Sequence, residues 1–183
     1  MPPAAGRIII LHGASSSGKS TLARVLQNCL DTPFLHLSID HFRDSGAIPV
    51  TRFRAGGFDW ARHRSDLFAG FHNALAGFAD AGNNLIVEHI LDTPGWHASL
   101  QKLLKDRSVL FVGMLCDRGV LLDREHQRGD RPIGSALQDA PSVHEGMMYD
   151  LELDGSQDPE SNARRIVQAL AGPDQRSGFF KTR

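Results

Sequence analysis

Apolar residues along the chain follow two alternating spacings. Short continuous apolar runs, which are typical of buried parallel strands, precede longer stretches in which apolar residues recur every three or four positions, as in amphipathic helices. The runs lie at 7–11, 34–40, 84–88, 108–115 and 149–153. The helical stretches begin at 19, 60, 96, 118 and 159. The alternation predicts an α/β fold, a parallel sheet flanked by helices on both faces.

Local signals mark several helix ends. Asp158 is a candidate N-cap with Pro159 at the first helical position, and Gly82 stands where a C-cap glycine would end the helix 60–81. Residues 43–57 combine glycine and arginine with weak periodicity, which predicts a mobile loop or short helix near the functional site. We therefore expect a single domain over 1–183, with flexible ends at 1–6 and 173–183.

Composition narrows the class of protein. Apolar residues make up 41% of the 183 residues and charged residues 22%, with a formal net charge of -1. A net charge this close to zero gives no positive electrostatic field that would attract a nucleic-acid backbone or an anionic membrane, so we expect neither partner. The apolar run 8–11 is far too short for a signal segment or a membrane span, and Cys29 and Cys116 show no metal spacing. We expect free thiols and a cytoplasmic protein; the oligomeric state is left open.

A phosphate-binding motif is the strongest chemical signal. Residues 13–20 match G-x-x-x-x-G-K-[ST] between a predicted strand and a predicted helix, the context that this loop requires and that a chance Gly/Ser-rich turn would lack. The motif predicts ATP and Mg²⁺ as cofactors. Lys19 would reach the β- and γ-phosphates, Ser20 would hold Mg²⁺, and Thr21 would assist the α-phosphate. The predicted nucleotide contacts are Gly13, Ala14, Ser15, Ser16, Ser17, Gly18, Lys19, Ser20 and Thr21.

Acidic residues follow three predicted strands, at the edge where open parallel sheets bind ligands. Asp40 is interpreted as a general base for an acceptor hydroxyl, with a helix N-cap as the alternative. Glu88 is either a residue that holds Mg²⁺ through water or a structural carboxylate. Asp117 is interpreted as a cap of the following helix.

Arg124, Arg128 and Arg131 lie at a helix end and in the Gly/Pro segment 129–141. Cationic side chains there favour a lid that closes over the transferring phosphate, and a solvated helix face is the alternative. The nine histidines show no tight ligand spacing, so we expect them to be surface or core residues.

The loop 11–20, Asp40, residues 116–117 and 124–131, V-H-E-G at 143–146 and Y-D-L-E-L-D at 149–154 together resemble the chloramphenicol phosphotransferase family. The resemblance implies a P-loop kinase fold with ATP as donor. It implies that Asp40 deprotonates the acceptor hydroxyl and that Arg128 and Arg131 stabilise the phosphates. By analogy with the wider kinase group, Arg124 would stack on adenine.

Two departures from the family pattern affect the acceptor. The family carries a pair of aspartates at the end of its third strand, where this chain has Glu88-His89, and the segment 43–60 is shorter and different. The resemblance therefore indicates the reaction, phosphoryl transfer to a small-molecule hydroxyl, more strongly than the substrate. The alternatives are a kinase for another metabolite, such as a nucleoside or sugar, and a regulatory P-loop module without an acceptor.

Overall fold

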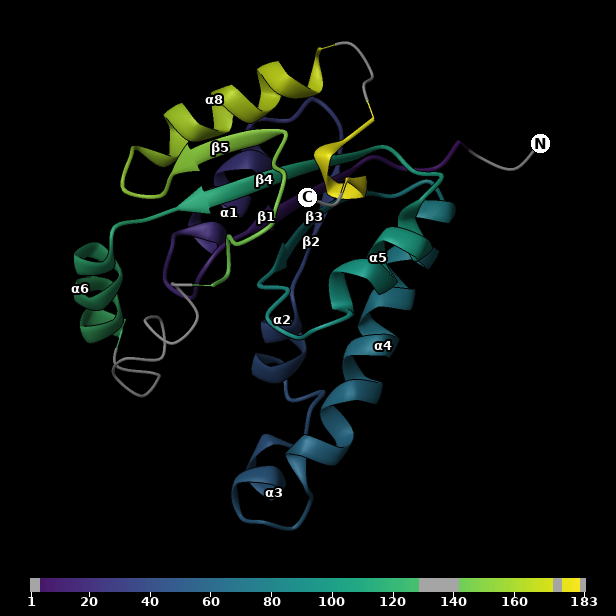
Figure 1. The fold of residues 1–183 in the computed structure, drawn as a ribbon, viewed down its shortest axis with the longest axis vertical. Coiled ribbons are helices and arrows are strands. Elements are labelled where there is room, and N and C mark those ends of the chain that lie inside the picture. Colours follow the sequence, from purple (N-terminus) through teal and green to yellow (C-terminus); the bar gives the residue numbers. More distant parts are fainter. Residues whose placement is uncertain (1–3, 129–141, 173–175, 182–183) are drawn as a thin grey trace.

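A single parallel sheet organises the chain. The computed structural model describes residues 4–128, 142–172 and 176–181, and within them five parallel strands pair in the order β2-β3-β1-β4-β5 (Figure 1). The strands are β1 (Ile8–His12), β2 (Phe34–Leu37), β3 (Asn84–His89), β4 (Val109–Leu115) and β5 (Leu151–Asp154). The predicted α/β fold is confirmed.

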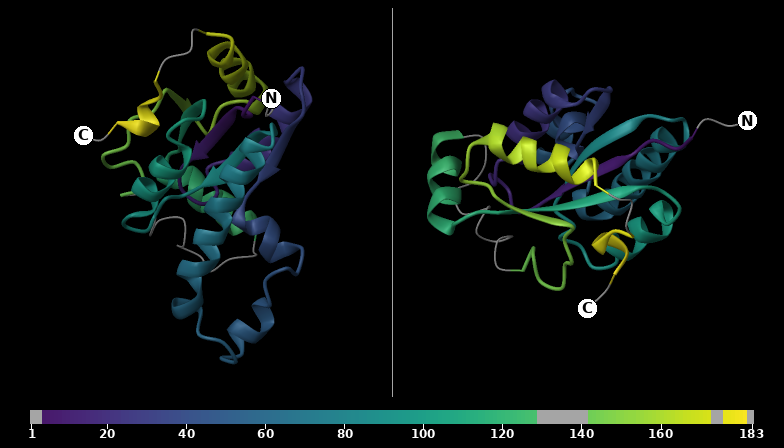
Figure 2. Two further views of the ribbon diagram at one scale, coloured as in Figure 1. Left: turned by 90° about the vertical axis from the view of Figure 1, so that its right-hand side faces the viewer. Right: turned by 90° about the horizontal axis from the view of Figure 1, so that it is seen from above.

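Helices cover both faces of this sheet (Figures 1 and 2). The alternation of β1 shows the two layers directly: Ile9 and Leu11 pack with α1 and α8, whereas Ile8 and Ile10 pack with α4 and α5. All four side chains are buried, as expected for a central parallel strand. The layers are formed by α1 (Lys19–Cys29), α8 (Pro159–Leu170), α4 (Trp60–Asp80) and α5 (Trp96–Leu104).

Residues 39–68 project from the sheet, and we call them the helical arm. They comprise α2 (Ile39–Asp44), α3 (Val50–Arg54) and the first turns of α4, with α3 at the end farthest from the sheet (Figure 1). The predicted strand 34–40 is too long, because the Ser38 side chain accepts a hydrogen bond from the His41 N–H and begins α2. The short-helix alternative for 43–57 is the one observed.

The last strand and the C-terminal segment differ from expectation. β5 begins at Leu151, two residues after the predicted start. Residues 176–181, expected to be a flexible end, contain a 3₁₀ helix, Gly178–Phe180, whose Phe179 is fully buried in the core. Ser177 donates to the Asp150 carboxylate at 2.5 Å, which fixes this segment against the sheet.

α6 (Arg118–Arg128) follows β4 at the carboxyl edge of the sheet. The Asp117 side chain accepts from the Gly119 N–H at 2.7 Å, as the capping interpretation predicts. Cys29 and Cys116 are free thiols. Among the helices that the structure describes, we find no stretch with the length and apolar character needed to cross a membrane.

Candidate active site

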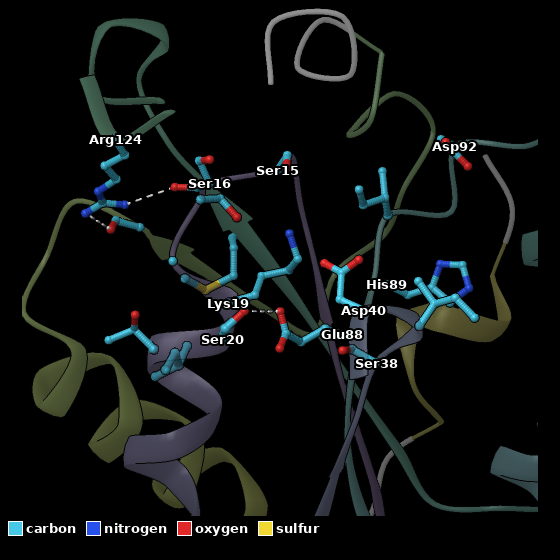
Figure 3. A pocket seen from close by; sticks show the side chains of 18 of the residues that line it. Ser15, Ser16, Lys19, Ser20, Ser38, Asp40, Glu88, His89, Asp92 and Arg124 are labelled. Carbon is cyan, nitrogen blue, oxygen red and sulfur yellow. Dashed lines mark hydrogen bonds between the residues drawn. The ribbon is translucent and has the colours of Figure 1, made fainter. Parts of the chain in front are cut away.

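A cleft of about 480 Å³ opens at the carboxyl edge of the sheet. Its walls come from the loop after β1, from α2, β3 and α6, and from residues of α4 and α5. Figure 3 shows Lys19, Asp40 and Glu88 pointing toward one region of this cleft, with Arg124 at one end and Asp92 at the other. The sheet topology thus brings together residues that are far apart in sequence.

The loop 13–20 has the features of an anion site. Gly18 caps α1 with φ of 98°, a left-handed conformation that glycine adopts without strain, and it provides no side-chain acceptor for the first N–H groups of the helix. The first turn of α1 carries no acidic residue. Ser17 Oγ is buried and has no hydrogen-bond partner within the described residues. These unmatched donors fit the phosphates of a nucleotide.

Lys19 is folded into the loop. Its Nζ donates to the carbonyl oxygens of Gly13 and Ala14, each at 2.7 Å, and only 7% of the residue is exposed. A charged phosphate oxygen is a stronger hydrogen-bond acceptor for an ammonium group than a neutral carbonyl is. The lysine is therefore placed where a phosphate would be its stronger partner.

Ser20 and Glu88 place two side-chain oxygen groups next to each other below the loop. Ser20 Oγ donates to Glu88 Oε2 at 2.8 Å, and His36 Nε2 contacts Glu88 Oε1 at 2.6 Å. Burial raises the pKa of Glu88, but the His36 hydrogen bond, the Lys19 charge and the Ser20 hydrogen bond together outweigh it and lower the pKa. The carboxylate is therefore ionised at neutral pH, and the pair offers the hard ligands that Mg²⁺ prefers.

Asp40 lies in the first turn of α2. Its carboxylate is 2.9 Å from Arg43 Nη1, its side chain is 44% exposed, and it lines the cleft. Because the observed N-cap of α2 is Ser38, the capping alternative for Asp40 is wrong. The carboxylate is accessible to a small molecule in the cleft.

Arg124 closes the opposite side of the loop. Its Nη2 donates to the Gly155 carbonyl at 2.9 Å and its Nη1 lies 3.4 Å from the Ser16 carbonyl. A Cβ on Gly155 would lie 2.2 Å from the Ser17 carbonyl oxygen, so the backbone passes too close for any side chain there. The segment after β5 therefore supports the phosphate loop directly.

A hydrogen-bonded chain behind the loop was not predicted. His12 Nε2 contacts the Ile90 carbonyl, so the ring donates there and His12 Nδ1 accepts from the Tyr149 hydroxyl at 2.8 Å. The Tyr149 oxygen in turn lies 2.6 Å from His144 Nδ1, which donates to it. Burial lowers the pKa of His12 to about 3, so the ring stays neutral. His144 belongs to the V-H-E-G motif and Tyr149 to the Y-D-L-E-L-D motif, and in the structure the two residues contact each other behind the phosphate loop.

The far end of the cleft carries aromatic and cationic groups that sequence reasoning also missed. The Arg64 guanidinium lies 4.4 Å from the Trp96 ring centroid and 5.0 Å from that of Phe68. It also donates to Asp92 at 3.0 and 3.1 Å and to Thr93 at 2.6 Å. The contact with Trp96 could not be predicted from helical spacing, because Arg64 lies in α4 and Trp96 in α5.

A histidine pair lies beneath this wall. His89 Nδ1 accepts from the Leu91 N–H at 2.9 Å, so His89 carries its proton on Nε2 and donates it to His72 Nε2 at 2.8 Å. Burial lowers the pKa of His72 to about 4 and that of His89 well below its usual value. Both rings are neutral at pH 7.

A second pocket of about 340 Å³ lies in the helical arm, next to the cleft. It shares Ile39, Asp40 and Phe68 with the cleft, so the Asp40 carboxylate stands where the two spaces meet. Its wall is mainly apolar. The other lining residues are Arg43, Ile48, Val50, Phe53, Arg54 and Trp60.

The predicted lid is outside the part of the chain that the structure describes. Residues 129–141, including Arg131, are not among the described residues, and neither is the side chain of Arg128. Of the predicted site residues, the structure therefore brings together the loop 13–20, Thr21, Asp40, Glu88 and Arg124, all of which line the cleft or its loop.

Comparison with known proteins places the sequence among phosphotransferases. Residues 6–171 match the family described as "Chloramphenicol phosphotransferase-like protein". A Mycobacterium tuberculosis protein named "Putative O-phosphotransferase" is 27% identical over 173 residues, which cover 84% of this chain and 77% of that protein. The family matched is the one that the motifs resemble.

Solved structures share the fold. The APS kinase CysC of Mycobacterium tuberculosis, in complex with AMPPNP and APS, has a TM-score of 0.68 at 19% identity, over 93% of this chain and all of that chain. Shikimate kinase from Acinetobacter baumannii, in complex with shikimate, has a TM-score of 0.64 at 20% identity, over 92% and 94%. At these identities the likeness concerns the fold, which is that of the P-loop kinases.

Proposed function

Since the chain belongs to the chloramphenicol phosphotransferase-like family, we propose that it transfers the γ-phosphoryl group of ATP to a hydroxyl of a small molecule. One observation carries the proposal. Lys19, Ser20, Glu88 and Asp40 come from three separate stretches of sequence and converge on one cleft (Figure 3). Phosphoryl transfer requires a cation for the phosphates, oxygen ligands for Mg²⁺ and a base near the acceptor, and these residue types meet all three needs.

The nucleotide would bind along the loop 13–20, with its phosphates on the N–H groups at the start of α1. Lys19 would exchange its carbonyl partners for the β- and γ-phosphates. Ser20 would hold Mg²⁺ directly, with Glu88 oriented toward it through water, while Thr21 assists the α-phosphate and Arg124 stacks on adenine. When bound, Mg²⁺ neutralises charge on the phosphates.

The chemical step needs a proton acceptor. Asp40 would take the proton of the acceptor hydroxyl as its oxygen bonds to the γ-phosphorus and the bond from phosphorus to the β–γ bridging oxygen breaks, so that ADP leaves. Arg128, at the end of α6, and Arg131, on the proposed lid over residues 129–141, would stabilise the negative charge on the transferring group. Both arginine roles rest on the family resemblance.

The acceptor would approach Asp40 from the helical arm. The pocket there is mainly apolar and opens at Asp40, so an acceptor with a hydroxyl beside an apolar or aromatic portion fits it. Chloramphenicol is one candidate of this kind. A nucleoside or sugar acceptor is the alternative, and the Arg64 and Asp92 side chains at the far end of the cleft would offer it polar contacts.

A phosphorylation screen tests the proposal. The protein is incubated with MgATP and a library of hydroxyl compounds that includes chloramphenicol, and ADP and phosphorylated product are measured together. We expect ATP consumption to depend on an acceptor and to fall to background in Lys19→Ala. ATP hydrolysis that is independent of every acceptor and rises only with a partner protein would instead favour the regulatory module.

A further inference from the structure

Three side chains beside the proposed Mg²⁺ position form a second candidate metal site. His36 lies in β2, His41 in α2 and Glu88 in β3. One ligand atom from each residue lies within 4.8 Å of the other two, the one such group of three among the described residues. We expected these histidines to be surface or core residues, because a spacing of five residues places them on no common face of a helix or a strand.

The local turn explains why the two histidines meet. β2 ends at Leu37 and Ser38 begins α2, so the extended chain becomes helical between the two histidines and their rings lie against each other. Their centroids are 4.5 Å apart with the rings nearly perpendicular, and His36 Nε2 lies 2.6 Å from Glu88 Oε1. The three ligand atoms thus come from a strand, a helix and a neighbouring strand.

From this geometry we propose that His36, His41 and Glu88 bind a divalent transition metal ion of the Zn²⁺ type. Two imidazoles and one carboxylate are the donors that such ions prefer, whereas Mg²⁺ prefers oxygen ligands alone. Metal–nitrogen bonds of about 2 Å place tetrahedral ligands about 3.3 Å apart, so the widest separation in the group, at most 4.8 Å, closes by up to about 1.5 Å. His41 is exposed and can rotate to close it.

Binding changes one proton position and one contact. His36 now donates from Nε2 to Glu88, so coordination through Nε2 moves the ring proton to Nδ1 and puts the metal where that hydrogen bond was. Glu88 carries a full negative charge, which balances half the charge of the ion. The fourth ligand would be water, since the described residues supply three.

Metal titration of the full chain tests the site. Metal-free protein is titrated with ZnCl₂ by calorimetry, without nucleotide or acceptor, and Co²⁺ absorption reports the coordination geometry. His41→Ala and His36→Gln each remove one ligand, and His36→Gln keeps a donor for Glu88. His63→Ala, an exposed histidine of α4 outside both pockets, is the matched control.

We expect the parent and His63→Ala to bind one Zn²⁺ at this site, and both ligand variants to raise the Kd by at least about tenfold, within the range for loss of metal-site residues. Circular dichroism confirms that each variant is folded. Equal Kd values in the parent and in folded His41→Ala and His36→Gln, or no binding by the parent, would overturn the proposal.

A consequence for activity rests on the proposed function. A Zn²⁺ ion on Glu88 draws the carboxylate away from Ser20, so Zn²⁺ should inhibit phosphoryl transfer in the parent and inhibit His41→Ala at least tenfold less strongly. Because the titration contains no ATP, an inactive protein that still binds Zn²⁺ contradicts the kinase proposal and supports the metal site. Equal inhibition of both proteins would contradict the link through Glu88.

Discussion

The phosphate-binding edge of the sheet and the helical arm are built in opposite ways. At the edge, residues 8–11 of β1 are at most 1% exposed, and both neighbouring strands pair with them in register. In the arm, Phe42 and Trp60 are 36% and 40% exposed, and no strand of the described sheet enters it. The edge is positioned by backbone pairing, and the arm by a few contacts among side chains.

Because of this difference, the sequence indicates the type of reaction more clearly than it indicates the substrate. A phosphate loop needs glycines, a lysine and a hydroxyl at fixed spacing, and only a strand and a helix can present them. An acceptor pocket needs an apolar space of the right shape, which many sequences can line. The residues at the phosphate-binding edge therefore indicate phosphoryl transfer, whereas the residues of the helical arm do not define the acceptor, which has to be found by experiment.

Lys19→Ala should produce the largest effect. Removing the ammonium takes away the cation that neutralises the β- and γ-phosphates, so phosphoryl transfer should fall to background and ATP binding should weaken. Activity and ATP affinity are measured beside Lys102→Ala, an exposed lysine of α5 that should behave as the parent does. Parental turnover in folded Lys19→Ala would break the link between the edge and the reaction.

Asp40→Asn should lower the acceptor-dependent rate by roughly 10²–10⁴-fold, the usual contribution of a general base, while ATP affinity stays constant. The aspartate stands where edge and arm meet, so the variant tests whether the two regions share one reaction. The measurement is the rate as a function of pH. We expect an acidic limb in the profile of the parent and its loss in the variant.

Ser38→Ala is the matched control for Asp40→Asn. It removes the observed cap of α2, which should cost about 1 kcal/mol of folding free energy and leave the shape of the pH–rate profile unchanged. If Asp40→Asn and the parent gave superimposable rates and profiles, Asp40 would not be the base.

Phe53→Ala should affect the acceptor alone. Phe53 lines the pocket of the arm, and losing part of its apolar contact should raise the acceptor KM by about tenfold, equivalent to about 1.4 kcal/mol. The KM for ATP should not change. Phe78→Ala, on an exposed phenylalanine of α4 outside the pocket, should leave both constants unchanged. A parallel rise in both constants would show that the arm and the edge are not separable.

We expect the smallest effect from His72, which lies where α4 passes from the helical arm into the core. This residue should make the stability of the fold depend on pH. His72 has a pKa of about 4 in the folded protein, below the ordinary value of 6.5. Between pH 4 and 6.5 the His72 ring is protonated more in the unfolded chain than in the folded protein. The contribution of neutral His72 to the free energy of unfolding is therefore complete above pH 6.5 and is lost as the pH falls toward 4. Urea unfolding from pH 7 to 4.5 should show it.

The His72→Gln variant keeps a hydrogen-bond acceptor for His89 and removes the titratable imidazole at position 72. The fall in unfolding free energy should become shallower by up to about 1.4 kcal/mol per pH unit, the value of one proton. His126→Gln, on an exposed histidine of α6, should keep the parental slope. Parallel slopes for His72→Gln and the parent would show that His72 is protonated equally in both states.

Sequence reasoning reached the sheet and the phosphate loop because their signals are local. β1 and the loop lie within thirteen consecutive residues, and Ser20 and Lys19 follow from their spacing. It missed contacts that tertiary structure creates, such as His12 with Tyr149, which are 137 residues apart. It also extended β2 to Asp40, because the apolar alternation continues through Ile39 while Ser38 already begins a helix.

The C-terminal segment shows the same limit. Nothing local predicts that Phe179 enters the core, because a single aromatic residue near the end of a chain has no periodicity. Its pocket is formed by β4 and α5, so only the assembled sheet shows where the ring goes.

The close approach of Gly155 to the phosphate loop has a consequence during synthesis. The ribosome makes the loop long before Gly155 and Tyr149, which supply the carbonyl that holds Arg124 and the hydroxyl that holds His12. A nascent chain that has reached Asp117 carries the complete motif without its supports. ATP binding by ribosome-bound chains of increasing length should therefore begin abruptly, only after β5 and the turn that follows it have left the exit tunnel.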